Sequence, residues 1–366
     1  MIVSEGLSPT RRGLLASSAM ATLAGAIGSP IAASAEDQGL AEASPLPVEE
    51  SFPSLGGATG WLNSPPLRPA GLRGKVVLVD FWTYTCVNWL RTSPYVRAWS
   101  EKYASQGLVV IGVHTPEFPF ERNLDNVRLM AKTLKVGYPI ATDNDYAIWN
   151  AFKNSYWPAL FFVDAQGRLR YRYFGEGAYD SSERVIQRLL SEAGVRDVSR
   201  GLVSVDPSGL EVAADWESVK SPESYLGYAK AESFVSEHGV WDKAHAYAAP
   251  ARLRLNDWAL SGDWTISKGL AALNRTGGRI ACRFHARDLN LVLAPPAPGA
   301  SVRFRVLLDG QPPGAGHGTD LDEQGNGRVV EPRTYQLIRQ RRPIADRRFE
   351  VVFLDPGVQA FVFTFG

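Results

Sequence analysis

Apolar runs alternate with amphipathic stretches through residues 57–196. Two runs, KVVLVDFW at 75–82 and LVVIGVHT at 108–115, are apolar at consecutive positions, as expected for strands buried on both faces. Residues 87–104, 120–135 and 181–194 have helical spacing, and the first of these helices contains Pro94. Short strands are predicted at 138–144 and on both sides of Gln166-Gly167. Strands that alternate with helices predict an α/β sheet.

From about residue 200 the pattern changes to alternation with period two. ARLRLN, SVRFRVLLDG and FEVVFLDPGVQAFVFTFG alternate in this way and are separated by loops rich in proline and glycine. This pattern is typical of half-buried antiparallel strands and predicts an all-β sandwich or jelly roll. We therefore place two folded domains at 57–196 and 215–366, with a connector at 197–214.

The first 56 residues lack both patterns. Arg11-Arg12 begins a stretch similar to a twin-arginine export signal, a mild apolar stretch follows, and Ala33-Ser34-Ala35 fits a cleavage site. Residues 1–35 are predicted to be a twin-arginine signal peptide and residues 36–56 a linker. We expect a soluble protein that is periplasmic or otherwise extracytoplasmic and is exported by the twin-arginine route.

Charge and cysteine content exclude several classes of function. Without residues 1–35, which hold two arginines and one glutamate, 37 basic and 37 acidic residues remain. A neutral protein has no electrostatic footprint for nucleic acid, so no nucleic-acid partner is expected. The two cysteines, Cys86 and Cys282, are too few for a disulfide scaffold, and no cysteine–histidine cluster suggests a metal site. No cofactor is expected.

Cys86 carries the most specific chemistry. It follows the predicted strand at 75–82 and precedes the predicted helix at 87–104, so it lies at a helix N-terminus, where the dipole favours a thiolate and lowers the thiol pKa. Asp80, inside the apolar strand, is a candidate proton relay with a raised pKa. Trp157-Pro158 precedes another strand, and a cis bond there would turn its backbone toward the cysteine.

These residues together resemble the thioredoxin superfamily. The match comprises Val79-Asp80-Phe81-Trp82, Cys86 at its spacing, Pro94 and Pro158, with an additional strand–helix unit like that of the TlpA and peroxiredoxin-like branches. LRGKVVLVDFWTYTCVNWLRTSPYVRAW, VVIGVHTPEFPFE and SPESYLGYAKAESF are similar to DipZ-like periplasmic proteins. That resemblance implies a TlpA-like thioredoxin domain, then a sandwich resembling a carbohydrate-binding module. It also implies a membrane electron donor, here acting in trans.

The chain departs from the dithiol form of this family at Trp89, which stands where the second cysteine is expected. A second thiolate normally resolves the mixed disulfide, so Cys86 can start exchange and needs a partner to finish it. Cys282 is either that partner or a small buried hydrophobe. Trp89 with Trp82, Tyr84 and Trp157 is expected to form an aromatic rim that binds substrate near the sulfur. Glu117 either tunes the Cys86 proton or caps a loop.

Three functions stay open. The first is thiol–disulfide exchange or redox sensing through one thiol, with envelope protein thiols or disulfides or a small thiol as partners. The second is a one-cysteine peroxidase acting on a peroxide. Thr83 stands three residues before Cys86 as in peroxiredoxins, but Val79 replaces the proline of that family. The third is a non-enzymatic binding protein whose sandwich binds cell-wall carbohydrate.

Overall fold

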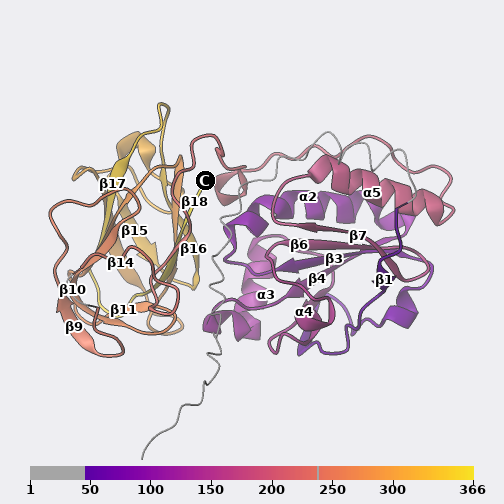
Figure 1. The fold of residues 1–366 in the computed structure, drawn as a ribbon, viewed down its shortest axis with the longest axis horizontal. Helices are drawn as coiled ribbons and strands as arrows, with labels where there is room; N and C mark the ends of the chain where they lie inside the picture. The colour runs from indigo at the N-terminus through magenta and orange to yellow at the C-terminus, as the bar shows by residue number, and fades with distance from the viewer. Residues whose placement is uncertain (1–45, 237–238) are drawn as a thin grey trace, which may run out of the picture. The chain divides into compact units, whose positions relative to one another are not determined.

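The first part of the structure is one mixed sheet with helices on both faces (Figure 1). The structure, a computed structural model, describes residues 46–236 and 239–366, so the predicted signal peptide lies outside the described residues. The strands are β1 (Glu50–Ser51), β2 (Gly60–Leu62), β3 (Val76–Trp82), β4 (Leu108–His114), β5 (Ile140–Thr142), β6 (Ala159–Val163) and β7 (Arg168–Phe174). Their order is β1-β7-β6-β3-β4-β5-β2, with β3, β4 and β5 parallel and the other neighbours antiparallel.

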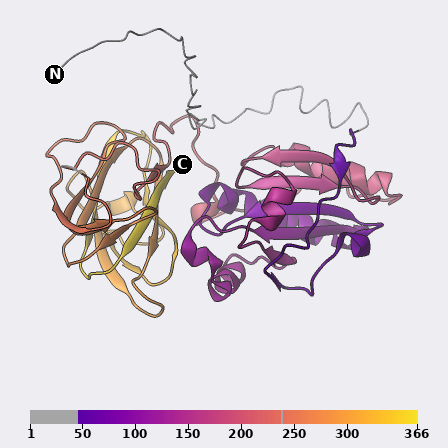
Figure 2. The same cartoon turned by 60° about the horizontal axis from the view of Figure 1, so that its bottom comes forward.

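Helices cover this sheet because its central strands are apolar on both faces. The α-helices are α2 (Val87–Tyr103), α3 (Leu124–Thr133), α4 (Ala147–Ala151) and α5 (Tyr179–Glu192). Short 3-10 helices occupy η1 (Pro69–Leu72), η2 (Ala104–Gln106) and η3 (Pro119–Arg122). Apolar residues of α2, α3 and α5 pack with Val76 and Leu78 of β3, while those of α4 pack with Val77 and Val79. Figure 1 shows α2 and α5 on the same side of the sheet, and Figure 2 shows the strands running side by side.

The elements agree with the predicted pattern except at their ends. The helix predicted from residue 120 begins at Leu124, because the Asn123 side chain caps it by accepting hydrogen bonds from the backbone N–H groups of Asp125 and Asn126. α5 begins at Tyr179, two residues before the predicted start at 181. The residues predicted as linker also end earlier than expected. Residues 50–51 form β1, and Leu55 is buried in the core of the sheet.

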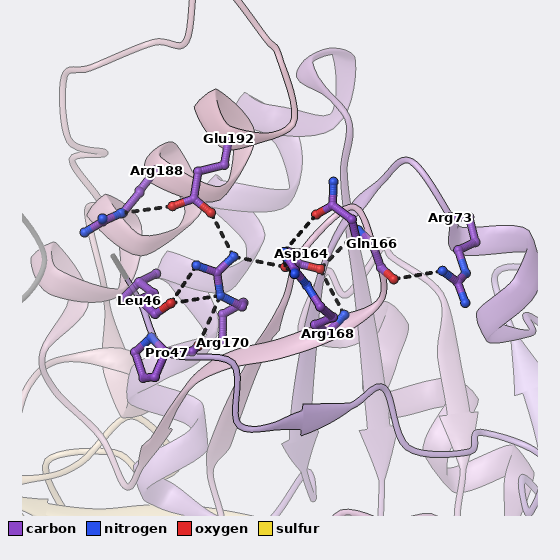
Figure 3. Close-up of polar contacts among 9 residues, drawn as sticks. All are labelled: Leu46, Pro47, Arg73, Asp164, Gln166, Arg168, Arg170, Arg188 and Glu192. Atoms are coloured by element: carbon purple, nitrogen blue, oxygen red, sulfur yellow. Dashed lines mark hydrogen bonds and ion pairs between the residues drawn. The ribbon is translucent and has the colours of Figure 1, made fainter. Parts of the chain in front are cut away.

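Arg170 anchors the segment that leads into β1 (Figure 3). Its guanidinium lies 3.0 Å from the Asp164 carboxylate and 2.8 Å from that of Glu192, and it donates hydrogen bonds to the carbonyls of Leu46 and Pro47. Arg170 is buried, and the planar fork of a guanidinium serves several acceptors at once. One side chain therefore joins β7, α5 and the chain ahead of β1.

Arg170→Lys is expected to lower the free energy of unfolding by about 1–2 kcal/mol, because lysine keeps the charge and loses the fork. Urea unfolding at neutral pH measures the change. The control is Arg128→Lys, in an exposed pair with Asp125, which should change stability by less than about 0.5 kcal/mol. Equal effects of the two substitutions would contradict the anchoring role.

The second part of the structure is all β, with antiparallel ladders. Its strands are β8 (Ser224–Tyr225), β9 (Ala244–Tyr247), β10 (Trp258–Ile266), β11 (Ala271–Leu273), β12 (Arg279–Phe284), β13 (Asp288–Ala294), β14 (Val302–Leu308), β15 (Asn326–Val329), β16 (Arg333–Arg339), β17 (Arg347–Phe353) and β18 (Gln359–Phe365). The path runs β15-β14-β17-β12-β10-β11-β18-β13-β16, with β8 beside β18 and β9 beside β10. Short 3-10 helices lie at η4 (Gly209–Glu211) and η5 (Gly314–Gly316).

β10 joins the two sheets of this domain. Its first half pairs with β12, and its second half pairs with β9 and β11. The change falls at Gly262, which has a φ of +96° and whose Cβ would lie 2.9 Å from the Cα of Gly278. A strand that bends at such a residue makes the corner of a sandwich. The period-two prediction is confirmed for SVRFRVLLDG, where buried and exposed residues alternate along β14, and for FEVVFLDPGVQAFVFTFG, which forms β17 and β18. It is wrong for ARLRLN, because residues 251–256 lie in the loop between β9 and β10.

Within residues 46–236 and 239–366, no helix combines the length and the apolar character that crossing a bilayer requires.

Candidate active site

Cys86 lies between the central strand of the first sheet and its longest helix. It is the N-cap residue of α2, with its backbone N–H donating to the Thr83 carbonyl and its own carbonyl accepting from Leu90. The thiol is free and half-buried, and its Sγ lies 3.8 Å from the carbonyl oxygen of Trp157. The Trp157–Pro158 bond is cis, as the sequence suggested. The strand end, the helix start and the cis-proline loop thus meet at one sulfur atom.

The prediction that the pKa of the Cys86 thiol is lowered is wrong in direction. Burial is the largest influence and raises the pKa of this thiol well above its ordinary value. The backbone N–H groups of Trp89 and Asn88 in the first turn of α2 lower it, as a helix N-terminus should. Glu117 and Glu223 raise it again through their negative charge. At neutral pH Cys86 is therefore a thiol, and the helix end only reduces the cost of ionising it.

Trp89 fills the space next to Asp80. Its indole Nε1 donates to Asp80 Oδ2 at 3.0 Å, and the Tyr138 hydroxyl donates to the same oxygen at 3.1 Å. The indole also stacks on Trp82, with ring centroids 4.2 Å apart. Burial raises the pKa of Asp80 to about 7, although both hydrogen bonds lower it. The raised pKa agrees with the prediction, and the Trp89 indole and the Tyr138 hydroxyl both bond the same carboxyl oxygen.

The expected aromatic rim is largely core. Trp82, Tyr84 and Trp89 are fully buried, so they are packing residues rather than a surface that contacts substrate. They pack with the apolar side chains that face α2 because a strand end buried on both faces leaves no route to solvent. Of the four predicted aromatics, Trp157 alone keeps some exposure; it packs on Trp149 with centroids 4.3 Å apart.

His114, at the end of β4, is enclosed by the same aromatic rings. It lies 5.0 Å from the Trp82 ring and 5.6 Å from that of Tyr84. Burial lowers the pKa of His114 to about 3, so the imidazole is neutral at physiological pH. A neutral, fully buried histidine packs as part of the core and does not exchange protons with solvent.

A buried carboxyl that sequence reasoning missed supports the loop before Cys86. Glu121 accepts a hydrogen bond from the Thr85 hydroxyl at 2.6 Å and from the backbone N–H groups of Glu117 and Phe118. Burial raises its pKa to about 7, while the Thr83 and Thr85 hydroxyls lower it. The signal was present in VVIGVHTPEFPFE, where two acids follow the strand end four residues apart.

The second domain also reaches this site. Thr334 donates its hydroxyl to the Thr85 carbonyl at 2.7 Å, directly before Cys86. Tyr225 donates its hydroxyl to Glu117 Oε1 at 2.5 Å and lies 3.1 Å from Glu223 Oε2. The sequence left Glu117 either tuning the Cys86 proton or capping a loop, and it did not predict the contact with Tyr225, although both residues of β8 lie in the motif SPESYLGYAKAESF.

Cys282 does not meet Cys86. It lies on β12, opposite Trp258 and Phe349 of the neighbouring strands, within the apolar core of the second domain. Of the two readings that the sequence left open, the buried hydrophobe is the one that fits this position. Among residues 46–236 and 239–366, no group of three or more acidic, histidine or cysteine side chains is placed to hold a metal ion.

Two protein families match this chain, one over the α/β part and the other over the all-β part. Residues 50–188 match the redoxin family, and residues 221–366 match the family described as thioredoxin like C-terminal domain. Protein DipZ of Mycobacterium tuberculosis is 36% identical over 319 residues, which are 86% of this chain and 42% of DipZ. The chain thus spans about two fifths of the length of this relative.

Two further relatives match the first domain alone. The thiol-disulfide oxidoreductase YkuV of Bacillus subtilis is 29% identical over 147 residues, which are 40% of this chain and 99% of YkuV. The solution structure of a thioredoxin-like protein in the oxidised form is 30% identical with a TM-score of 0.37, covering 39% of this chain and 96% of that one. The chain therefore contains a domain of the redoxin family followed by a thioredoxin-like C-terminal domain, and over 86% of its length it is similar to part of DipZ.

Proposed function

We propose that this protein is an extracytoplasmic thioredoxin-like protein that performs thiol–disulfide exchange, or senses redox state, through the single thiol of Cys86. The observation that carries the proposal is the position of Sγ at the start of α2, 3.8 Å from the carbonyl that precedes cis-Pro158. Trp89 occupies the place of a second thiol and is fixed there by stacking and a hydrogen bond. Cys86 can therefore form a mixed disulfide, but Trp89 supplies no thiol to resolve it.

The exchange reaction needs an external thiol to complete it, because Cys86 has no second thiol beside it. The Cys86 sulfur attacks a disulfide as its proton leaves, so one S–S bond breaks, a mixed disulfide with Cys86 forms, and one thiol is released. An external thiol then attacks the mixed disulfide, frees Cys86 and becomes part of a new disulfide. A small thiol, or a protein thiol of the cell envelope, fits this role. A membrane electron donor acting in trans would supply its electrons.

The location and the carbohydrate partner are parts of the same proposal. The twin-arginine-like stretch and the cleavage site within residues 1–35 support export. In the second domain, Trp216 and Trp241 are 39% and 43% exposed, whereas Trp258 and Trp264 are core residues. Exposed indole rings can stack on sugar rings, so these two tryptophans are the side chains that would contact a cell-wall carbohydrate.

The test is formation of a mixed disulfide by the native protein. We expect bis(2-hydroxyethyl) disulfide to add one mercaptoethanol group to Cys86, located by peptide mass spectrometry and released by a small thiol. Cys86→Ser should abolish the adduct, and the matched control Cys282→Ala should keep it, since that sulfur is enclosed in the core.

Two outcomes would contradict the proposal. If Cys86 reacts only after unfolding, the thiol is an inert packing residue and the domain is a binding module. If peroxide converts Cys86 to sulfenic acid much faster than any disulfide reacts, the protein is a one-cysteine peroxidase.

A further inference from the structure

Four segments of the first domain surround the Cys86 sulfur. They are residues 83–85, the start of α2, the loop 115–121 that follows β4, and the loop that ends in cis-Pro158. The parallel pairing of β3 with β4 places the loop 115–121 beside residues 83–85, and the Thr85–Glu121 hydrogen bond joins them. A folded protein that brings a disulfide to this sulfur must rest on these segments, because even a transient redox contact takes up to about 600 Å² of surface on each partner.

The second domain already holds the residue before Cys86. Thr334 of β16 donates its hydroxyl to the Thr85 carbonyl at 2.7 Å, and both threonines are buried. An extended segment of a partner protein gains affinity from hydrogen bonds to backbone groups that are exposed. The backbone at Thr85 cannot offer such bonds, because the contact with β16 encloses it.

The loop that follows β4 is enclosed by an apolar contact. Phe118 and Phe120 pack on Phe361 of β18, with ring centroids 5.1 Å and 4.9 Å apart. Val292 and Val362 of the second domain belong to the same cluster. Contacts between buried aromatic rings are among the strongest apolar contacts that proteins make. This cluster therefore keeps the second domain on the loop, where a partner protein would otherwise rest.

A third contact reaches α2. Arg91, five residues after Cys86, donates from Nη2 to the Phe365 carbonyl of β18 at 3.2 Å. Its Nη1 lies 2.9 Å from Glu176 Oε1, and the two side chains are 2% and 8% exposed. A guanidinium buried in this way is held by both acceptors, since losing either would leave a desolvated charge without its partner. The second domain thus contacts three of the four segments around the sulfur.

Some surface next to the sulfur stays exposed. Cys86, Asn88 and Trp157 each keep part of their surface, whereas Thr85 and Val87 are buried. The cis-proline loop, which carries Trp157, is the fourth segment. A disulfide with only a few atoms on each side of its S–S bond needs to contact this exposed surface alone.

We infer that the second domain restricts Cys86 to low-molecular-weight disulfides and thiols and excludes the disulfides of folded proteins. The Cys86 sulfur loses its proton and attacks the small disulfide, whose S–S bond breaks. A mixed disulfide with Cys86 forms, and the released sulfur takes up a proton. A small external thiol reverses the process and becomes part of a new disulfide. The inference rests on the proposed exchange reaction and names its substrate class.

The test compares two disulfides at neutral pH, using the full chain. Mixed-disulfide formation at Cys86 is followed by mass spectrometry with bis(2-hydroxyethyl) disulfide and with insulin. Each rate is divided by the rate of glutathione with the same disulfide, which corrects for the reactivity of the disulfide itself. We expect the corrected rate with insulin to be at least about tenfold lower than that with the small disulfide.

Variants of the domain contact then show whether the second domain causes this difference. Phe361→Ala removes the ring that packs on Phe118 and Phe120, and it should raise the corrected insulin rate at least about fivefold relative to the small-disulfide rate. Thr334→Val keeps the side-chain shape, removes the hydrogen bond to Thr85 and should act in the same direction. The matched control Phe349→Ala removes an equal ring from the core of the second domain and should leave the ratio unchanged.

Three results would overturn the inference and leave the proposed function intact. The first is a parent protein whose corrected rates with insulin and the small disulfide are equal. The second is a selectivity that persists in folded Phe361→Ala and Thr334→Val. The third is an equal gain in Phe349→Ala, which would reflect general loosening of the second domain. A parent protein that forms no adduct with either disulfide overturns both the inference and the proposed function. If the variants fail to fold, the comparison of the two disulfides on the parent decides.

Discussion

Asp80→Asn is expected to raise the free energy of unfolding by about 2–4 kcal/mol at pH 8 and to change it little at pH 4.5. Asp80 is fully buried, and its pKa is raised to about 7 in the folded protein. The unfolded chain has an ordinary pKa near about 4. Between these values the folded state binds more protons than the unfolded state, so stability falls as the pH rises from about 4 to about 7. Above that window the full cost of a buried charge is present.

Asparagine removes this cost because it cannot ionise, and it keeps an oxygen that can accept from Trp89 and Tyr138. Urea unfolding of both proteins at the two pH values gives the comparison. Asp125→Asn is the control, because that aspartate is 86% exposed in the first turn of α3. A gain that is the same at both pH values would contradict the assignment, since it would reflect packing rather than ionisation.

Trp89→Cys is expected to lower the free energy of unfolding of the reduced protein by about 3–5 kcal/mol. The substitution empties a fully buried volume, removes the stacking on Trp82 and takes a hydrogen bond from Asp80. The matched control is Trp241→Cys, at a tryptophan that is exposed, which should cost less than about 1 kcal/mol. Chemical unfolding under reducing conditions measures both.

Under oxidising conditions the new thiol should form a disulfide with Cys86, because the two residues bound the first turn of α2. The oxidised variant should then recover part of the lost stability, since the cross-link restricts the unfolded chain. A variant that loses little stability when reduced would show that Trp89 is not a packing residue. A reduced variant that folds and never oxidises would show that the start of α2 departs from dithiol geometry.

Local pattern determined the elements of this protein. The apolar run 75–82 is β3, the spacing of 87–104 with its internal proline is α2, and two of the three period-two stretches are strands of the second domain. These predictions hold because side-chain periodicity reflects which face of an element is buried, and that information lies within a few residues. The resemblance carried by residues 79–94 and Pro158 placed Cys86 beside the cis-proline loop for the same reason: the motif is short and its spacing is rigid.

Only the tertiary structure decided how the site works. Whether Trp89 lines a surface or fills a core depends on Asp80 and Trp82 of β3 and on Tyr138 ahead of β5, which are distant in sequence. The sign of the Cys86 pKa shift depends on desolvation by the packed surroundings, which the nearby helix end opposes and does not overcome. Tyr225 meets Glu117 across 108 residues of sequence, and Thr334 meets Thr85 across 249. Side-chain period carries no information about such pairs, because desolvation and long-range hydrogen bonds arise only when separate elements pack together.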